Sequence, residues 1–178
     1  MNSQTQIATF VSQAAKGNRI AQQEIYRQHC GAMLSLCVRM MGDRYIAEDV
    51  MQDGFIKVFM RLPQLKEPKK LSGWIKRIIL NECMDQLKKV RHFEEVEEHD
   101  FEDEGEGENW FEGISFDQIN DEIDRLSDGS RQVFTLYLIE DMKHREIAEL
   151  LGVSVSTVKS QYQRALKQLR TRLKAIMI

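Results

Sequence analysis

Residues 145–170 read REIAELLGVSVSTVKSQYQRALKQLR, a short helical pattern and a longer one that are separated by Gly152. Apolar residues recur in both at the spacing of three and four that one face of a helix requires. The inward positions are Ile147, Ala148 and Leu151 in the first helix and Val158, Tyr162, Ala165, Leu169 and Leu173 in the second. Glycine readily takes the left-handed conformation that ends a helix, and Ser154 can cap the helix that follows. This order predicts a helix-turn-helix, whose second helix enters the major groove of DNA.

The outward side of the second predicted helix is rich in groups that suit a DNA groove. The candidate contacts there are Ser156, Thr157, Lys159, Ser160, Gln161, Gln163 and Arg164. Short hydroxyls suit phosphates, amides suit adenine and guanidinium groups suit guanine. Further contacts to the phosphate backbone are expected from Lys167, Arg170, Arg172 and Lys174. An ordinary amphipathic surface helix also has a polar outer face, so the pattern alone leaves both interpretations open.

The rest of the chain also shows helical periodicity with no competing strand pattern, which predicts an all-α fold. Gly17 and Gly42 are expected to end the first two helices, and Asn18, Asp43 and Ser72 to cap the second, third and fourth. The predicted inward residues of the first half are Ile7, Phe10, Val11, Ala14, Ala15, Ala21, Ile25, Met33, Cys37, Met40, Ala47, Val50, Val58, Leu62, Ile75, Ile78, Ile79 and Leu87. Those that precede the helix-turn-helix are Phe116, Ile119, Ile123, Leu126, Val133, Phe134, Tyr137 and Leu138.

The net charge of −3 conceals an uneven distribution along the chain. Residues 1–93 contain 15 basic and 8 acidic residues. Residues 94–124 contain 15 acidic residues and no basic ones, and residues 125–178 contain 10 basic and 5 acidic residues. Two basic modules therefore flank an acidic stretch, which suggests domains that bind a polyanion and a segment that imitates one. A solvated linker that only keeps two domains soluble is the alternative. Residues 94–112 can bury too little apolar surface to become ordered, so we expect a flexible linker there.

Several classes of protein are disfavoured by composition. Cys30, Cys37 and Cys83 are odd in number and form no C-x-x-C motif, which predicts neither a disulfide framework nor a zinc site. No cofactor is expected. No apolar run approaches the roughly 20 residues needed to span a bilayer, and the N-terminus lacks the order of a secretory signal. We therefore expect a cytoplasmic protein without membrane insertion. A metal-dependent nuclease would need two or three carboxylates fixed at one site, whereas residues 94–112 scatter them, so no catalytic residues are expected.

Three stretches carry a resemblance to a known family. Residues 145–170, preceded by SRQVFTLYLIEDM at 130–142, resemble the fourth conserved region of the extracytoplasmic-function (ECF) group of bacterial RNA polymerase sigma factors. The stretch AEDVMQDGFIKVF at 47–59 is similar to the polymerase-binding helix of that family's second region. The stretch SGWIKRIILNECMDQLKK at 72–89 is similar to the helix that engages the upstream edge of the melted promoter. Separate motifs in the family's order are more specific than a single helix-turn-helix.

The resemblance implies a role without chemistry of its own, in which the polymerase core polymerises and this subunit supplies promoter recognition and duplex opening. It implies region 2 at residues 1–93, an acidic linker at 94–115 that threads the RNA exit path of the polymerase, and region 4 at 116–178. The implied partners are RNA polymerase core, promoter DNA and an anti-sigma factor, and the free protein is expected to be a monomer. A helix-turn-helix regulator that acts without joining the polymerase is the alternative, and residues 1–93 match a polymerase-docking module instead.

Residue roles follow from the resemblance by position. The implied polymerase contacts are Asp49, Gln52, Asp53 and Phe55, with the alternative that the acidic pair only caps and solvates its helix. The minus-ten element is expected to contact Lys66, Lys69, Lys70, Lys76, Arg77, Asn81, Lys88 and Lys89. Among these, Asn81 is expected to face base edges. Lys76, Arg77, Lys88 and Lys89 are expected to hold the backbone, and Lys66, Lys69 and Lys70 line the preceding loop. The loop at 63–71 is expected to be exposed, after Pro63 ends the third helix. Trp74 is expected in the core, with stacking on an exposed base as the alternative. The residues expected to contact the minus-thirty-five element are Ser156, Thr157, Lys159, Ser160, Gln161, Gln163 and Arg164.

The chain departs from the family pattern at three positions. Gln161 stands where a basic residue is frequent, which leaves the base preference there in doubt. Ser127 stands where the family often has proline, which indicates a different entry to the next helix. Gly54 interrupts the polymerase-binding helix at an intrinsic cost of roughly 1 kcal/mol relative to alanine, so close packing is expected to require it.

Overall fold

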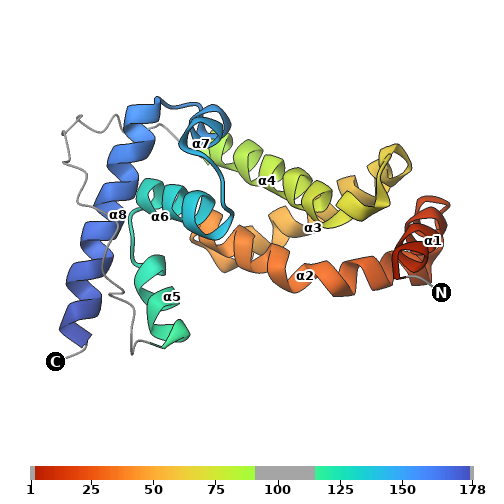
Figure 1. The fold of residues 1–178 in the computed structure, drawn as a ribbon, viewed down its shortest axis with the longest axis horizontal. Helices are drawn as coiled ribbons and strands as arrows, with labels where there is room; N and C mark the ends of the chain where they lie inside the picture. The colour runs from red at the N-terminus through yellow and green to blue at the C-terminus, as the bar shows by residue number, and fades with distance from the viewer. Residues whose placement is uncertain (1–2, 91–114, 177–178) are drawn as a thin grey trace. The chain divides into compact units, whose positions relative to one another are not determined.

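The computed structural model describes residues 3–90 and 115–176, and no strand occurs among them. The described helices form two compact units, one built from α1 to α4 and the other from α5 to α8 (Figure 1). The predicted all-α class is confirmed. None of the described helices is both long and apolar enough to cross a membrane. The acidic stretch predicted as a linker falls largely at 91–114, outside the described residues.

The first unit contains four helices and two 3₁₀ turns among its described residues. They are α1 (Ser3–Ala15), α2 (Arg19–Met41), α3 (Arg44–Arg61), η1 (Leu62–Gln64), η2 (Pro68–Lys70) and α4 (Leu71–Val90). The Asn18 side chain accepts a hydrogen bond from the Ala21 amide at 3.1 Å, and Asp43 accepts one from the Ile46 amide at 3.0 Å. Gly42 ends α2 in the left-handed conformation, with φ of 73°. These predicted caps are confirmed.

The expected cap at Ser72 is wrong. α4 already begins at Leu71, directly after the turn Pro68–Lys70, so Ser72 lies inside its first turn. Its hydroxyl oxygen lies 3.1 Å from Nε2 of His29, whose Nδ1 lies 2.8 Å from the Ile25 carbonyl oxygen. The serine therefore links α4 to α2.

The core of the first unit lies between α2, α3 and α4. The predicted inward residues of these helices are buried, as is Leu62 of η1. Gly54 of α3 also lies in this core, and a Cβ there would collide with the Ile79 side chain of α4. The expectation that close packing requires this glycine is confirmed.

The apolar stripe predicted for α1 was too wide. Val11 and Ala14 of α1 are buried, but Ile7 and Phe10 each remain 42% exposed. Because α1 packs on its neighbours through a narrow face, only part of its apolar residues reaches the core.

The second unit consists, in its described part, of α5 (Phe116–Asp124), α6 (Asp128–Phe134), a π-helical segment η3 (Thr135–Ile139), α7 (His144–Leu151) and α8 (Val155–Ile176). Its core is formed by Ile123, Leu126, Phe134, Ala165, Leu169 and Leu173. Leu138, expected inward, is exposed. The Glu140 amide donates to the Thr135 carbonyl, the five-residue spacing of a π turn, which rotates Leu138 away from an α-helical register.

Candidate nucleic-acid interface

The helix-turn-helix is formed by α7, Gly152 and α8. Gly152 is left-handed, with φ of 68°, and the Ser154 hydroxyl accepts a hydrogen bond from the Thr157 amide at 3.0 Å. The hydroxyls of Ser156 and Thr157 lie 2.7 and 2.8 Å from that of Ser154. Three hydroxyls therefore gather at the start of α8, where the first amides of a helix favour anions.

The outward side of α8 is accessible at most of the predicted contacts. Ser156 and Lys159 are exposed, and Thr157, Ser160, Gln163 and Arg164 are partly buried. Each of these side chains retains accessible surface, so they can take part in a DNA interface.

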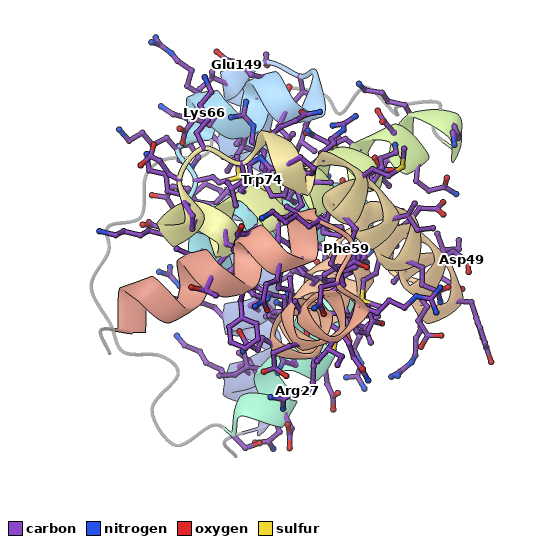
Figure 2. All side chains as sticks on the ribbon, turned by 90° about the vertical axis from the view of Figure 1, so that its right-hand side faces the viewer. Arg27, Asp49, Phe59, Lys66, Trp74 and Glu149 are labelled. Carbon is purple, nitrogen blue, oxygen red and sulfur yellow. The ribbon has the colours of Figure 1, made fainter. Side chains whose placement is uncertain are left out.

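The α3 helix presents a polar face with apolar side chains along it. Asp49, Gln52 and Asp53 are exposed at the spacing of three and four that places them together on one side. Asp49 is labelled in Figure 2. Ile56 and Met60 continue this face and are 58% and 73% exposed. Sequence reasoning missed these two residues, although they follow Gln52 at intervals of four.

The loop before α4 carries three of the predicted basic contacts. Lys66, Lys69 and Lys70 are exposed, and Lys66 projects from the unit (Figure 2). Lys70 forms an exposed ion pair with Glu67 at 2.9 Å. The predicted loop contains most of η1 and all of η2.

The α4 helix carries the other predicted minus-ten residues. Arg77, Asn81 and Lys88 are exposed at intervals that place them on one side of the helix. Lys89 is also exposed and Lys76 is partly buried. Trp74, expected in the core, is only partly buried (Figure 2).

Comparisons with known proteins agree with this arrangement. Residues 25–93 match the family described as Sigma-70 region 2, and residues 116–169 match Sigma-70, region 4. The chain is 28% identical to the ECF RNA polymerase sigma factor SigW of Bacillus subtilis, over 92% of this chain and 95% of the relative. It is 32% identical to the RNA polymerase sigma factor SigZ of the same organism, over 72% of this chain and 75% of the relative.

The chain belongs to the ECF group of RNA polymerase sigma factors. A solved structure with the same fold is the sigma factor RpoE from Bartonella quintana, in complex with the anti-sigma factor NepR. It is 20% identical, with a TM-score of 0.53, over 85% of this chain and 96% of that one. As a sigma factor, the protein directs promoter-specific initiation by RNA polymerase. The interpretation as a regulator that never joins the polymerase does not account for the region 2 match.

Gln161 of this sigma factor does not point outward, and that expectation is wrong. It is only 8% exposed, and its Oε1 accepts a hydrogen bond from the Ser130 hydroxyl of α6 at 2.8 Å. Gln161 lies three residues after Val158 and four before Ala165, so it falls on the buried stripe of α8. The absence of a basic residue here therefore reflects packing between α6 and α8.

The expected contact of Phe55 with the polymerase is the second prediction that the structure corrects. In this sigma factor the Phe55 side chain is buried, with 3% exposure. Its ring contacts the edge of the Tyr26 ring at a centroid distance of 4.8 Å. Phe55 lies four residues after Met51 and three before Val58, on the inner side of α3. Phe55 therefore belongs to the core of the first unit, whereas Ile56 and Met60 of the same helix are exposed.

Arg172 is used inside the second unit. Its guanidinium lies 3.7 Å from Glu122 and donates to the Arg125 carbonyl at 3.3 Å. The Glu122 carboxylate is buried and also pairs with the Arg125 side chain at 2.5 Å. Arg172 therefore links α8 to the end of α5, and its expected contact with the DNA backbone stays a prediction.

An aromatic cluster attaches α7 to α8. The Tyr137 and His144 rings stack at a centroid distance of 4.3 Å, and Tyr137 meets Tyr162 at 4.6 Å. Sequence reasoning missed His144, because its role depends on two rings from other elements. The three rings therefore link η3, the start of α7 and α8.

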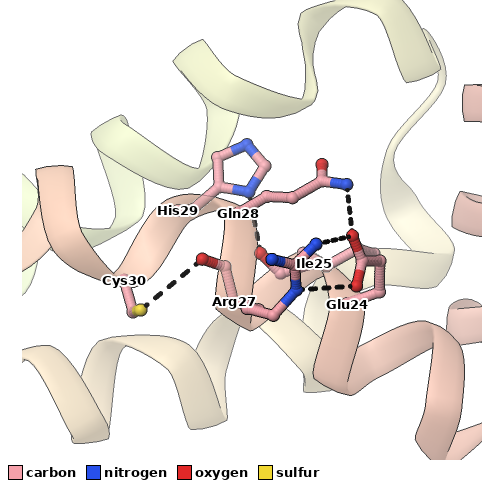
Figure 3. A network of polar contacts seen from close by, with 6 residues as sticks. All are labelled: Glu24, Ile25, Arg27, Gln28, His29 and Cys30. Atoms are coloured by element: carbon pink, nitrogen blue, oxygen red, sulfur yellow. Dashed lines mark hydrogen bonds and ion pairs between the residues drawn. The ribbon is translucent and has the colours of Figure 1, made fainter.

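Two polar features of the first unit were not expected. Glu24 accepts hydrogen bonds from Arg27 at 2.7 and 3.0 Å and from Gln28 at 2.8 Å, and these contacts lower its pKa from 4.5 to about 2 (Figure 3). Cys37 and Cys83, far apart in the sequence, are free thiols with their sulfur atoms 3.7 Å apart in the core. Contact with Cys37 and burial both raise the pKa of the Cys83 thiol.

Proposed function

We propose that this sigma factor binds polymerase core through α3, holds the minus-ten element with α4 and its preceding loop, and reads the minus-thirty-five element with α8. The observation that carries the proposal is that three exposed polar surfaces fall on the segments that match regions 2 and 4 of the family. Each surface has side chains of the chemistry that its proposed partner requires.

The polymerase-binding surface consists of Asp49, Gln52, Asp53, Ile56 and Met60. The acids and the amide supply polar contacts, and the two exposed apolar side chains supply surface that is stabilised by burial. Burial of an exposed apolar centre within a polar rim is the usual construction of a protein interface. This combination favours docking over the alternative that the acids only cap and solvate α3.

The minus-ten surface consists of α4 and the loop between α3 and α4. Extrusion of a base costs a few kcal/mol, which contacts to the exposed base and its backbone must offset. The Asn81 amide can donate to and accept from base edges, and Arg77 and Lys88 on the same side can neutralise phosphates. The remaining backbone contacts are Lys66, Lys69, Lys70, Lys76 and Lys89.

The minus-thirty-five surface consists of Ser156, Thr157, Lys159, Ser160, Gln163 and Arg164. Gln161 is excluded from it because its side chain is buried against α6. Arg164 has the geometry for paired hydrogen bonds to guanine, and Gln163 has that for adenine. The hydroxyls at the start of α8 suit a phosphate.

The wider role follows the family. We assign region 2 to residues 1–93, a linker to 94–115 and region 4 to 116–178, a division supported by the family matches at 25–93 and 116–169. The protein acts in the cytoplasm as a monomer, without catalysis or cofactors, and is held inactive by an anti-sigma factor. The complex of RpoE with NepR supports that last assignment.

Run-off transcription with purified polymerase core tests the proposal. Core with this protein should initiate at promoters that core alone does not use. The double variant Asp49→Lys and Asp53→Lys should lose core binding, whereas a matched control, Asp121→Lys and Asp124→Lys on exposed positions of α5, should retain it. Equal core binding by both variants would exclude α3 as the docking surface.

A further inference from the structure

The α1 helix lies outside the residues that match the region 2 family, yet it packs directly on the proposed minus-ten loop. The family match begins at residue 25, whereas α1 ends at Ala15. α1 contacts α2 and both 3₁₀ turns, η1 and η2, which enclose the loop residues between α3 and α4 (Figure 1). Its position is therefore defined by that loop as well as by the helix that follows it.

Apolar side chains of α1 and of the loop ends are buried, whereas the lysines of the loop are exposed to solvent. Val11 and Ala14 are the fully buried side chains among the described ones of α1. Leu62 and Leu71, at the two ends of the loop, are buried as well, whereas Lys66, Lys69 and Lys70 between them are exposed. The loop is thus anchored at both ends and presents its charges to solvent.

The backbone hydrogen bonds of the loop lie within its individual turns. The Leu65 amide donates to the Leu62 carbonyl at 3.1 Å, and the Lys70 amide donates to the Glu67 carbonyl at 2.9 Å. Both bonds are local to one turn, so neither fixes one turn relative to the other. α3 adjoins only η1 in the chain and α4 adjoins only η2, but α1 packs on both turns.

We propose that α1 is a positioning element for promoter opening, with Val11 as its anchoring residue. It holds the loop in the conformation that presents Lys66, Lys69 and Lys70 to the unpaired strand. A preordered loop loses less conformational entropy when it binds DNA, so affinity is gained without direct contact from α1. This inference rests on the proposed role of the loop in minus-ten binding.

The test compares Val11→Ala with Gln13→Ala, an exposed position on the same helix, in holoenzyme assembled from full-length protein. Two quantities are measured, the affinity for core and the affinity of the holoenzyme for a single-stranded minus-ten oligonucleotide. Val11→Ala should weaken oligonucleotide binding by roughly three- to tenfold, which lies in the lower part of the range for coupled neighbours, and leave core affinity unchanged. Gln13→Ala should change neither. A parallel loss of core affinity in Val11→Ala would overturn the proposal, because α1 would then stabilise the whole unit.

A double-mutant cycle identifies the route of the effect. In a background with Lys66, Lys69 and Lys70 all changed to alanine, Val11→Ala should cause little further loss, because the charges that α1 positions are gone. An equal loss in both backgrounds would overturn the proposal. If the triple lysine variant binds the oligonucleotide like wild type, the loop has no role in minus-ten binding and the inference about α1 falls with it. If the triple variant is impaired and Val11→Ala is not, only the role of α1 is excluded.

Discussion

The Ser130 hydroxyl donates a hydrogen bond of 2.8 Å to Oε1 of Gln161, and both side chains are buried between α6 and α8. This bond joins the DNA-reading helix to the helix behind it. Gln161, which was expected to contact a base, therefore contributes to the stability of the second unit.

Loss of this bond should destabilise the second unit. Ser130→Ala leaves Oε1 of Gln161 buried without its partner, which should lower the free energy of unfolding by about 1–3 kcal/mol. Urea denaturation of the full-length protein measures this change. Gln161→Leu should leave promoter base preference unaltered. If Gln161→Leu changed the promoter preference at one base pair and left the free energy of unfolding unaltered, Gln161 would be a DNA contact after all.

Two glycines within helices should respond to alanine in opposite directions. Gly54→Ala places a Cβ against the buried Ile79 side chain, so overpacking of about 1–3 kcal/mol should outweigh the gain in helix propensity. Gly31→Ala in α2 meets nothing within 4 Å, so it should raise the free energy of unfolding by about 0.5–1 kcal/mol. Thermal unfolding of the two variants makes the comparison. Stabilisation by both substitutions would show that Ile79 moves aside freely.

Arg164 and Lys159 should differ in how they affect promoter binding. Arg164→Ala should cost about 1–3 kcal/mol and relax preference at one position of the minus-thirty-five element, because a guanidinium reads guanine through paired hydrogen bonds. Lys159→Ala should weaken all sequences alike and reduce the salt dependence, as expected for a phosphate contact. Holoenzyme binding to single-substitution promoters at several salt concentrations separates the two. A uniform loss with Arg164→Ala would make it a phosphate contact.

The Glu24 carboxylate should contribute a small pH dependence to stability. Its pKa in the folded protein is about 2, below the usual 4.5, because Arg27 and Gln28 donate hydrogen bonds to the charged form. The stabilisation is therefore present above pH 4.5 and is lost as the pH falls toward 2. The effect should be small, since the Arg27 side chain is exposed and solvent screens its interaction with Glu24. Glu24→Gln should lose stability at pH 6 but match wild type near pH 2, and a constant difference across this range would contradict the assignment.

The caps and turns of this protein could be predicted from the sequence because they depend on a few neighbouring residues. Asn18, Asp43 and Ser154 each accept from an amide three residues away. Gly42 and Gly152 take the left-handed conformation at the ends of their helices. The exposed acids of α3 and the exposed basic residues of α4 followed from the family motifs in the same way.

Errors arose where burial depends on a partner from another part of the chain. Phe55 and Gln161 lie at the margins of helical stripes, and their neighbours Tyr26 and Ser130 come from other helices. Leu138 is exposed because a π turn changes the register within its own segment. Periodicity defines the centre of a buried stripe well, but not its width.

The sequence by itself determined the helical class, most of the helix ends and the family, because helix signals are local and the motifs of both regions are contiguous. Only the tertiary structure decided that Gln161 is a packing residue, that Cys37 meets Cys83 and that α1 covers the loop with Lys66, Lys69 and Lys70. These relationships join segments that are distant along the chain. Their existence depends on which helix faces pack together, and that is settled by the burial of apolar surface across the whole unit.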